Sequence, residues 1–399
     1  MGGLLHYKPE QDYHISLVEY GYNLSLLKSE FMKIGQLTFH APHNYGSVLQ
    51  AFALSKILQN MGHESEFINL RPQSQKDTYK IIKSSNKGIR LIFKLMIYPL
   101  LKKRFNHFER FINNVLPITV REYSSTEEMR QDSFDYDAYV VGGDQIWNPV
   151  CPDFEPAYYL QFLPEGNQAK KVSYSPSLGK TDFDKHTQEL IAQWIKCFDL
   201  ISVREKRGAE LIQTLTDKKV DLVCDPVVLL DKEEWSRLAV KPKLKNPYVL
   251  VYFLDNNHGS RDLTEYLRKI TGYEVVIFNE YMRDFFKPYH KAYSASPEEF
   301  VGLFMNASFI YTNSFHGTAF ATVFERPFIT AIAPDQENAR NNNDSRKIDY
   351  LKKIGLEERL YTTGLPTKDY LLNVDFENAR PLMEGFRKHS RVFLENALK

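Results

Sequence analysis

Cysteine is scarce in this sequence, whose 399 residues contain Cys151, Cys197 and Cys224 and no others. These three residues show neither CxxC spacing nor the even number of a disulfide framework. Such cysteine usage fits a reducing compartment best, so we expect a cytoplasmic protein.

Long apolar runs and an excess of charge of one sign are also missing. No run approaches the ~18–20 apolar residues of a membrane span, and the opening MGGLLHYKPEQDYH lacks a basic-then-apolar signal pattern. The formal net charge is +1, so we expect no nucleic-acid partner, and any anion binding must come from local clusters.

Several cofactor and metal motifs are absent. The sequence contains no Walker loop, no GxGxxG motif and no zinc-ligand spacing. We therefore expect no metal and no resident cofactor, and neither nucleotide hydrolysis nor dinucleotide redox chemistry is supported.

The sequence does contain a repeated alternation of strand and helix patterns. From Lys33 it runs strand, polar loop, amphipathic helix and strand, which is typical of a parallel sheet. Further apolar strands are expected at 200–203 and 328–332, among others. The stretch KPKLKNP at 241–247 is a linker pattern, and YVLVYFL then restarts the alternation.

A chain of 399 residues exceeds what one core usually organises. We predict an α/β fold with two Rossmann-like parallel-sheet domains that face a cleft, similar to the GT-B arrangement. The predicted parts are an N-terminal extension at 1–31, an αβ domain at 32–240, the linker at 241–247 and a second αβ domain at 248–399.

Residues 80–111 form a basic amphipathic segment. They include nine Lys or Arg residues among apolar side chains, with Glu109 as their opposing acid. One interpretation is a solvated helical face packed on the sheet, and the alternative is peripheral contact with an anionic membrane surface.

The first candidate motif is the loop His43-Asn44-Tyr45-Gly46-Ser47, between the first strand and the first helix. Backbone N–H groups and the helix dipole favour an anion at such a place. A purely structural alternative is that Asn44 or Ser47 caps the helix.

The second motif, Gly142-Gly143-Asp144-Gln145-Ile146-Trp147-Asn148, follows the strand AYVV at the sheet edge where α/β proteins bind ligands. Asp144 is a candidate general base for a sugar hydroxyl, and Trp147 a candidate stacking surface. Alternatively, Asp144 caps a turn and Trp147 fills the core.

Arg204 emerges after the strand LISV at the same edge, where its guanidinium suits a carboxylate or phosphate. The alternative is an ion pair with Glu205 or Glu210. Asp225, which follows the strand DLVC, either orients a base or ends the strand, and we favour the structural role.

The fourth motif is Asn313-Ser314-Phe315-His316-Gly317-Thr318, between a strand and a helix. Ser314, Thr318 and backbone N–H groups can bind phosphate there, while His316 can exchange a proton near neutral pH. Arg346 and Asn341–Asn343 follow in a polar stretch that forms either a substrate rim or a plain connection.

Six segments together resemble the ordered motifs of the polysaccharide pyruvyl transferase family, over about residues 32–359. They are HNYGSVLQAFAL, VVGGDQIWNP, SYSPSLG, SVRE, CDPVVLL and TNSFHGTAFATVFERPF. The resemblance implies a GT-B-like fold, phosphoenolpyruvate as donor and a sugar hydroxyl pair as acceptor, in capsular, exopolysaccharide or cell-wall glycan synthesis. A polyprenyl-diphosphate-linked oligosaccharide is one form of that acceptor.

By resemblance, Arg204 matches a donor-binding arginine and His316 the expected catalytic histidine, which we assign as the acid, with Asp144 as the base. We assign Ser314, Gly317, Thr318 and Arg346 to the donor. Acceptor binding is assigned to His43, Asn44, Tyr45, Gly46, Gln145, Trp147 and Asn148. The N-terminal domain is then the acceptor side and the C-terminal domain the donor side.

One position departs from the family pattern, because many members carry an arginine where this chain has Ser314. The candidates for the missing cation are Arg340, Arg346 and His43. Two other functions compete with pyruvyl transfer: a GT-B glycosyltransferase that uses a nucleotide sugar, and a glycan-binding protein without catalysis.

Overall fold

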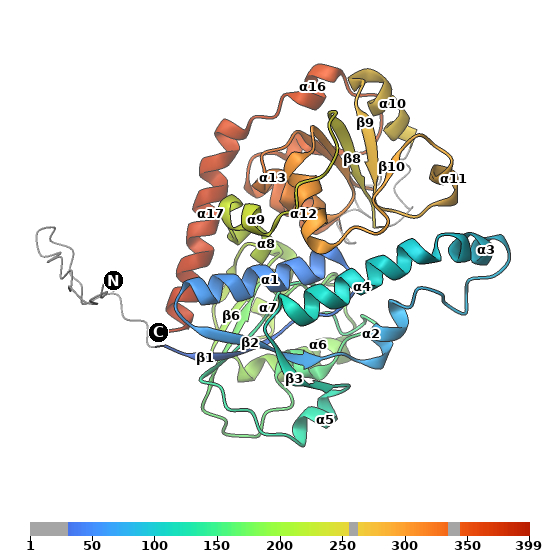
Figure 1. The fold of residues 1–399 in the computed structure, drawn as a ribbon. Coiled ribbons are helices and arrows are strands. Elements are labelled where there is room, and N and C mark those ends of the chain that lie inside the picture. Colours follow the sequence, from blue (N-terminus) through green and yellow to red (C-terminus); the bar gives the residue numbers. More distant parts are fainter. Residues whose placement is uncertain (1–30, 255–261, 334–343) are drawn as a thin grey trace, which may run out of the picture.

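The computed structural model describes residues 31–254, 262–333 and 344–399. The extension expected at 1–31 lies outside them except for Phe31, and so do Arg340 and 341–343. Figure 1 shows two α/β lobes, one above the other, with the first half of the chain in the lower lobe and most of the second half in the upper lobe.

The lower lobe is built on a seven-stranded sheet of order β3-β2-β1-β4-β5-β6-β7, in which every pairing is parallel. Its strands are β1 (Lys33–Leu37), β2 (Glu64–Leu70), β3 (Ile118–Tyr123), β4 (Ala138–Gly142), β5 (Lys170–Tyr174), β6 (Leu200–Val203) and β7 (Val220–Leu222). The strand order reverses between β1 and β4, which makes the loops after these two strands the expected place for a ligand.

The upper lobe contains a six-stranded parallel sheet of order β10-β9-β8-β11-β12-β13. Its strands are β8 (Tyr248–Tyr252), β9 (Glu274–Ile277), β10 (His290–Lys291), β11 (Phe309–Thr312), β12 (Phe328–Ala331) and β13 (Leu360–Tyr361). Here the order reverses between β8 and β11. The prediction of two Rossmann-like parallel-sheet domains is confirmed, while the bounds of the domains stay a prediction.

Helices cover both faces of each sheet. Those that accompany the first sheet are α1 (Tyr45–Asn60), α2 (Gln73–Thr78), α3 (Ile89–Met96), α4 (Tyr98–Asn114), α5 (Thr126–Arg130), α6 (Lys185–Trp194), α7 (Lys206–Thr214), α8 (Pro226–Leu229) and α9 (Lys232–Leu238). Those that follow β8 are α10 (Asp262–Thr271), α11 (Met282–Phe285), α12 (Pro297–Asn306), α13 (Phe315–Val323), α15 (Ser345–Lys353), α16 (Lys368–Leu372) and α17 (Phe376–Ala397).

The long helix α17 carries the chain back from the upper lobe to the first sheet (Figure 1). Ser390 of this helix accepts a hydrogen bond from the backbone N–H of Cys224 at 2.8 Å. The Arg387 guanidinium donates to the carbonyl of Val228 at 2.6 Å. These buried contacts tie the end of the chain to the segment that follows β7.

One continuous hydrophobic core joins the two lobes. Strand β4 shows how it is made, because Val140 faces this shared core while Tyr139 packs into a separate core on the other face of the first sheet. In the second sheet, Leu250 faces the shared core and Val249 the outer one. The alternation of β-strand side chains therefore places the helices between the sheets in contact with both lobes.

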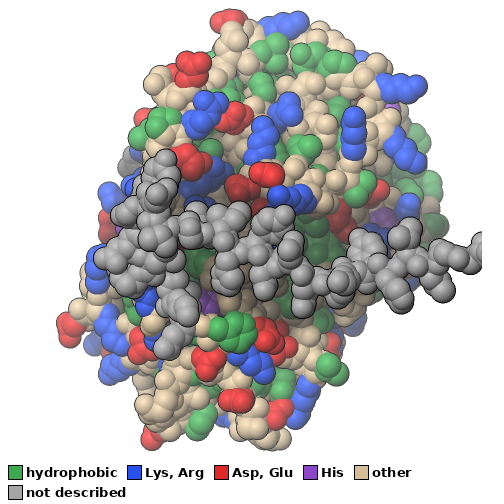
Figure 2. Space-filling model, turned by 60° about the vertical axis from the view of Figure 1, so that its left-hand side comes forward, with side chains coloured by type: hydrophobic (Ala, Val, Ile, Leu, Met, Phe, Trp, Pro, Cys, Tyr) green, Lys and Arg blue, Asp and Glu red, His purple; other side chains and the backbone are tan. Residues whose placement is uncertain are grey.

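Acidic and basic side chains are interspersed over the face that Figure 2 presents, as expected for a net charge of +1. Within the described residues, no helix is long and apolar enough to cross a membrane.

Candidate active site

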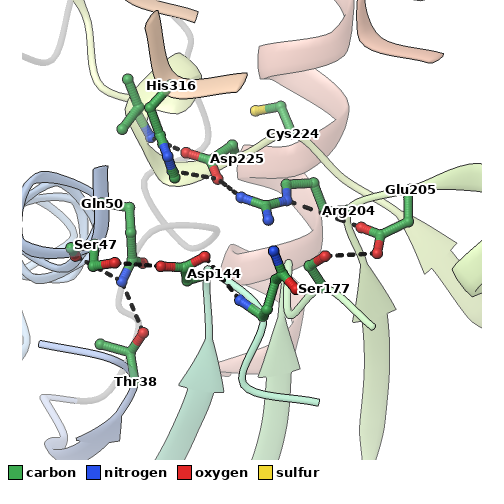
Figure 3. Close-up of polar contacts among 12 residues, drawn as sticks. Thr38, Ser47, Gln50, Asp144, Ser177, Arg204, Glu205, Cys224, Asp225 and His316 are labelled. Carbon is green, nitrogen blue, oxygen red and sulfur yellow. Dashed lines mark hydrogen bonds and ion pairs between the residues drawn. The ribbon is translucent and has the colours of Figure 1, made fainter. Parts of the chain in front are cut away.

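The candidate catalytic residues meet where the two lobes face each other (Figure 3). Asp144 follows β4, Arg204 follows β6 and Asp225 follows β7, all at the carboxyl edge of the first sheet. His316 belongs to α13, which begins just after β11 of the second sheet. The convergence expected from the sequence arises because parallel strands end at a common edge.

Asp225 lies at the centre of this group and is fully buried. The Arg204 guanidinium donates through Nη1 to Asp225 Oδ2, and His316 Nε2 lies 3.6 Å from the same oxygen. The other oxygen accepts from the N–H of Val227 at 2.9 Å and so caps α8. Burial alone would raise the pKa of Asp225, but Arg204 and then His316 hold it well below its usual range.

For Asp225 the sequence pattern favoured a structural role over orienting a base, and its contacts in the structure suit both. A carboxylate that caps a short helix satisfies the structural interpretation, and Asp225 does so. Yet it also contacts the two residues assigned to chemistry, one from each lobe. Its position just after a parallel strand, the same signal that identified Arg204, also indicates the second role.

One edge of the Arg204 guanidinium, formed by Nε and Nη2, is open to a ligand. These two nitrogens make no hydrogen bond within the described residues, although both are buried. Because Nη1 is held by Asp225, the Nε–Nη2 pair is the fork that matches a carboxylate or phosphate. The Phe315 ring lies below the guanidinium, 4.7 Å from ring centroid to Cζ, and fixes its plane.

The expected alternative partner, Glu205, is engaged elsewhere. Its Oε1 accepts from the Ser177 hydroxyl at 2.7 Å and from the N–H of Leu178 at 2.9 Å. Its Oε2 lies 3.9 Å from Arg204 Nε, beyond hydrogen-bond distance. The segment SYSPSLG thus positions Glu205, and Asp225 is the acid that pairs closely with Arg204.

Asp144 is held at the first strand-order reversal in a left-handed backbone conformation, with φ of 42°. The Ser47 hydroxyl of α1 donates to Asp144 Oδ2, and the N–H of Gln145 donates to Oδ1 at 2.9 Å. The preceding Gly143 also has positive φ, and a Cβ there would overlap Gln50. This packing holds the Asp144 carboxylate close to α1. Figure 3 shows this carboxylate between Ser47 and Arg204.

The segment 43–47, which contains the N-cap and first turn of α1, has a structural role as well. Asn44 caps the helix, accepting from the N–H of Gly46 at 2.9 Å, so the capping alternative is confirmed for this residue. Gly46 lies against the imidazole of His316. The buried Tyr45 donates to the carbonyl of Ala295 at 2.8 Å and thereby links the two lobes.

At α13, the hydroxyls expected to bind the donor are used within the fold. Ser314 caps the helix by accepting from the N–H of Gly317 at 3.3 Å. Thr318 is fully buried, and its hydroxyl lies 3.0 Å from the carbonyl of Ser314 and 2.9 Å from the Thr330 hydroxyl. His316 is therefore the ionisable side chain that this motif brings to the group.

Trp147 lies in the core instead of at a ligand surface. It is fully buried, stacks on Tyr159 at 4.9 Å between ring centroids and donates to the carbonyl of Tyr158 at 3.0 Å. No face of the indole is open to a sugar, so the alternative core role holds. The amide of Asn148 donates to Gln145 at 3.3 Å, which keeps these two side chains together.

A cavity of about 390 Å³ lies between the lobes. Its walls include His43, Asn44, Tyr79 and Arg104 from the first half of the chain and Glu280 from the second. Burial, then the carboxylates of Asp153 and Asp144, raise the pKa of Tyr79. Asp144 therefore lies within electrostatic reach of the cavity wall.

Of the three candidates for the missing cation, Arg346 is the one found beside Arg204. It is buried on α15, lines the same small cavity as Arg204, and its Nε makes no hydrogen bond within the described residues. Burial, then the neighbouring Arg204, lower its pKa. His43 is instead bound to Glu109 at 2.7 Å, and Arg340 lies outside the described residues.

The family model described as polysaccharide pyruvyl transferase matches residues 44–336. No curated protein matches the chain. Among solved structures, a putative UDP-N-acetylglucosamine 2-epimerase from Listeria monocytogenes is similar at 12% identity and a TM-score of 0.44, covering 90% of this chain and 97% of that chain. The E. coli ADP-heptose lps heptosyltransferase II is similar at 11% identity and a TM-score of 0.35, covering 90% and 99%.

Proposed function

Since this chain belongs to the polysaccharide pyruvyl transferase family, we propose that it transfers a pyruvyl group from phosphoenolpyruvate to two hydroxyls of a sugar, forming a ketal. The family supports a transferase with a sugar or polysaccharide acceptor. We extend this to a cytoplasmic enzyme of capsular, exopolysaccharide or cell-wall glycan synthesis.

The observation that carries the proposal is the pair of buried, incompletely bonded guanidinium groups of Arg204 and Arg346. Phosphoenolpyruvate carries a carboxylate and a phosphate, which together require cationic donors. Arg204 is already paired with Asp225, whereas burial and then Arg204 lower the pKa of Arg346, and the carboxylates of Glu205, Asp144 and Asp225 offset this only in part. A dianionic donor would relieve the remaining repulsion between the two guanidinium groups.

The donor cannot enter without local movement. The cavity that Arg204 and Arg346 both line has a volume of about 20 Å³, which is room for roughly one water. Phe315 and Tyr350 also line it, so these rings or their neighbours must part when phosphoenolpyruvate binds.

The first step of the proposed reaction is a proton transfer. His316 donates it to the methylene carbon of phosphoenolpyruvate, which leaves an oxocarbenium-like centre at the neighbouring carbon. Asp225 supplies a counter-charge for the imidazolium before transfer, because its carboxylate lies 3.6 Å from His316 Nε2. Arg204 and Arg346 balance the charge of the carboxylate and phosphate as the transition state forms.

One sugar hydroxyl then adds to that centre and loses its proton to Asp144. The carbon–oxygen bond to phosphate breaks, the second hydroxyl adds in its place, and inorganic phosphate leaves with the second hydroxyl proton. Ser47, which donates to Asp144, orients the carboxylate for this step. The cavity between the lobes is the proposed place for the acceptor, because Asp144 acts electrostatically on Tyr79 in its wall.

A comparison of the two possible donors tests the proposal. The purified protein is incubated with a panel of cell-wall and capsular oligosaccharides and with either phosphoenolpyruvate or nucleotide sugars. Acceptor-dependent phosphate release from phosphoenolpyruvate is the expected result, and it should disappear in the Asp225→Asn variant. Release of a nucleoside diphosphate from a nucleotide sugar would instead establish glycosyl transfer, and glycan binding without either release would establish a non-catalytic protein.

A further inference from the structure

Helix α3 exposes a row of large apolar side chains. Ile89 and Ile92 are each 67% exposed, Leu95 is 53% exposed and Met96 is 54% exposed. At about 100° per residue these four side chains occupy roughly one third of the helix circumference. Helix α4 continues the exposed apolar surface with Tyr98 and Leu100.

The helix is nevertheless anchored. Phe93, Ile97 and Leu101 are buried in a small cluster of their own, and the Phe93 ring packs edge-on against Phe285 of α11 at 5.5 Å between centroids. Phe286, next in the chain, is 87% exposed. The apolar row therefore lies on a helix that packs against the upper lobe, and Figure 1 shows α3 at the outer end of α4, below α11.

Basic residues are interleaved with this row and flank it in the sequence, and they fall into two groups. Four of the nine form ion pairs: Lys80 with Asp77, Lys94 and Arg104 with Glu280, and Arg110 with Glu298. The other five are exposed and have no ion pair within the described residues: Lys83, Lys87, Arg90, Lys102 and Lys103. The sequence predicted Glu109 as the opposing acid of this segment, but Glu109 binds Arg71 and His43.

We propose that α3 and the start of α4 dock the protein on an anionic lipid surface. An apolar row without a partner, bordered by unpaired cations, matches the two components of such a surface, because the row can enter the acyl boundary while the cations meet the headgroups. A second protein chain would cover the row equally well, but it would have no need of the cations.

Docking through this row would bring the cavity between the lobes within about one helix diameter of the membrane, because Lys94, on the opposite face of α3, lines that cavity. Lys83, Lys94 and Leu101 belong to the basic segment and also line that cavity. If pyruvyl transfer is the function, as proposed above, an acceptor carried on a lipid diphosphate could reach Asp144 without leaving the surface. Docking itself depends only on the surface of α3 and α4.

Vesicle co-sedimentation tests the docking. The whole protein is mixed with vesicles of phosphatidylcholine alone or with added phosphatidylglycerol, at low and high salt. We expect binding to the anionic vesicles that weakens as salt rises, because the Debye length shrinks. Each basic residue near the surface contributes about fivefold to partitioning, so Lys87→Glu with Arg90→Glu should lower it at least tenfold.

The apolar contribution is tested with Ile92→Glu combined with Met96→Glu. This pair should abolish sedimentation, whereas Val120→Glu, on an exposed strand, and Lys185→Glu, on α6, should leave it unchanged. Absence of binding, equal binding to both vesicle types or equal loss in the control variants would overturn the proposal. A wild-type dimer in light scattering that Ile92→Glu dissociates would assign the row to a second copy instead.

Turnover with phosphoenolpyruvate and a lipid-free oligosaccharide separates this inference from the proposed function. The α3 variants should keep that turnover, because none of the four substituted residues lines the cavity. If the wild type binds anionic vesicles but lacks turnover, the docking stands and the proposed function fails.

Discussion

Gly46 and His316 are in direct contact across the two lobes. A Cβ atom at Gly46 would lie 2.1 Å from Nδ1 of His316, a separation that real atoms do not reach. Gly46 lies in the first turn of α1, and His316 in the first turn of α13. The absence of a side chain at position 46 therefore allows His316 of one lobe, the proposed catalytic acid, to approach the other.

We predict that Gly46→Ala displaces His316 and lowers turnover by two or more orders of magnitude, because small misplacements of a catalytic group are costly. Gly385→Ala is the matched control, since a Cβ at that position of α17 meets nothing within 4 Å. The control should keep full activity and gain up to about 1 kcal/mol of stability. Equal activity of both variants would show that the contact has no catalytic consequence.

His316→Ala should lower turnover by about 10²–10⁴-fold, the usual contribution of a general acid, while the thermal unfolding midpoint stays close to that of the wild type. Exposed His186 serves as the control, and His186→Ala should be silent. Near wild-type turnover of His316→Ala would remove this residue from the mechanism.

Arg204→Lys should not restore donor binding, since an ammonium cannot reproduce the Nε–Nη2 fork left open beside Asp225. The apparent KM for phosphoenolpyruvate should rise, and the same is expected of Arg346→Lys. Arg380 is the control, because it is exposed and pairs with Glu325 away from this group. The bidentate role is wrong if Arg204→Lys binds the donor as the parent does.

His40 should make stability fall on mild acidification. Burial lowers its pKa from 6.5 to about 4, against the hydrogen bond to Asn69 at 3.1 Å. Between pH 6.5 and about 4, the His40 imidazole binds a proton in the unfolded chain but not in the folded chain. The stability that the neutral, buried imidazole contributes is therefore fully present above pH 6.5 and is lost as pH falls to about 4. The free energy of unfolding falls by on the order of 3 kcal/mol over this pH range.

In unfolding experiments from pH 7 to 4, His40→Gln should therefore show a shallower decline of the midpoint than the wild type. His186→Gln should follow the wild type, since His186 is exposed. Parallel curves for all three proteins would show that His40 titrates normally in the fold.

Much of the fold could be predicted because buried parallel strands are continuous apolar runs. The strand at 200–203 was predicted with the bounds of β6, and that at 328–332 with those of β12 to within one residue. Strand β3 was missed because it is an edge strand whose side chains at 120–122 face solvent, with Val120 fully exposed. Edge strands lack the apolar pattern on which the prediction depends.

The candidate site was predictable in outline, since Arg204 and Asp144 follow strands of one sheet and therefore share an edge. The pairing of Arg204 with Asp225 was not, because Glu205 and Glu210 are nearer in sequence. The contact of Gly46 with His316 depends on how the helices between the sheets pack, which no local pattern encodes. Trp147 gave an ambiguous signal, because a tryptophan after a strand suits both a core and a ligand surface.

The most direct measurement of the central claim is the mass of the glycan after incubation with phosphoenolpyruvate. The account predicts that an accepted oligosaccharide gains one pyruvate less one water, that one phosphate is released per transfer, and that mild acid removes the group, as expected of a ketal. No mass change across a full set of cell-wall and capsular glycans, or the gain of a whole sugar from a nucleotide sugar, would contradict it.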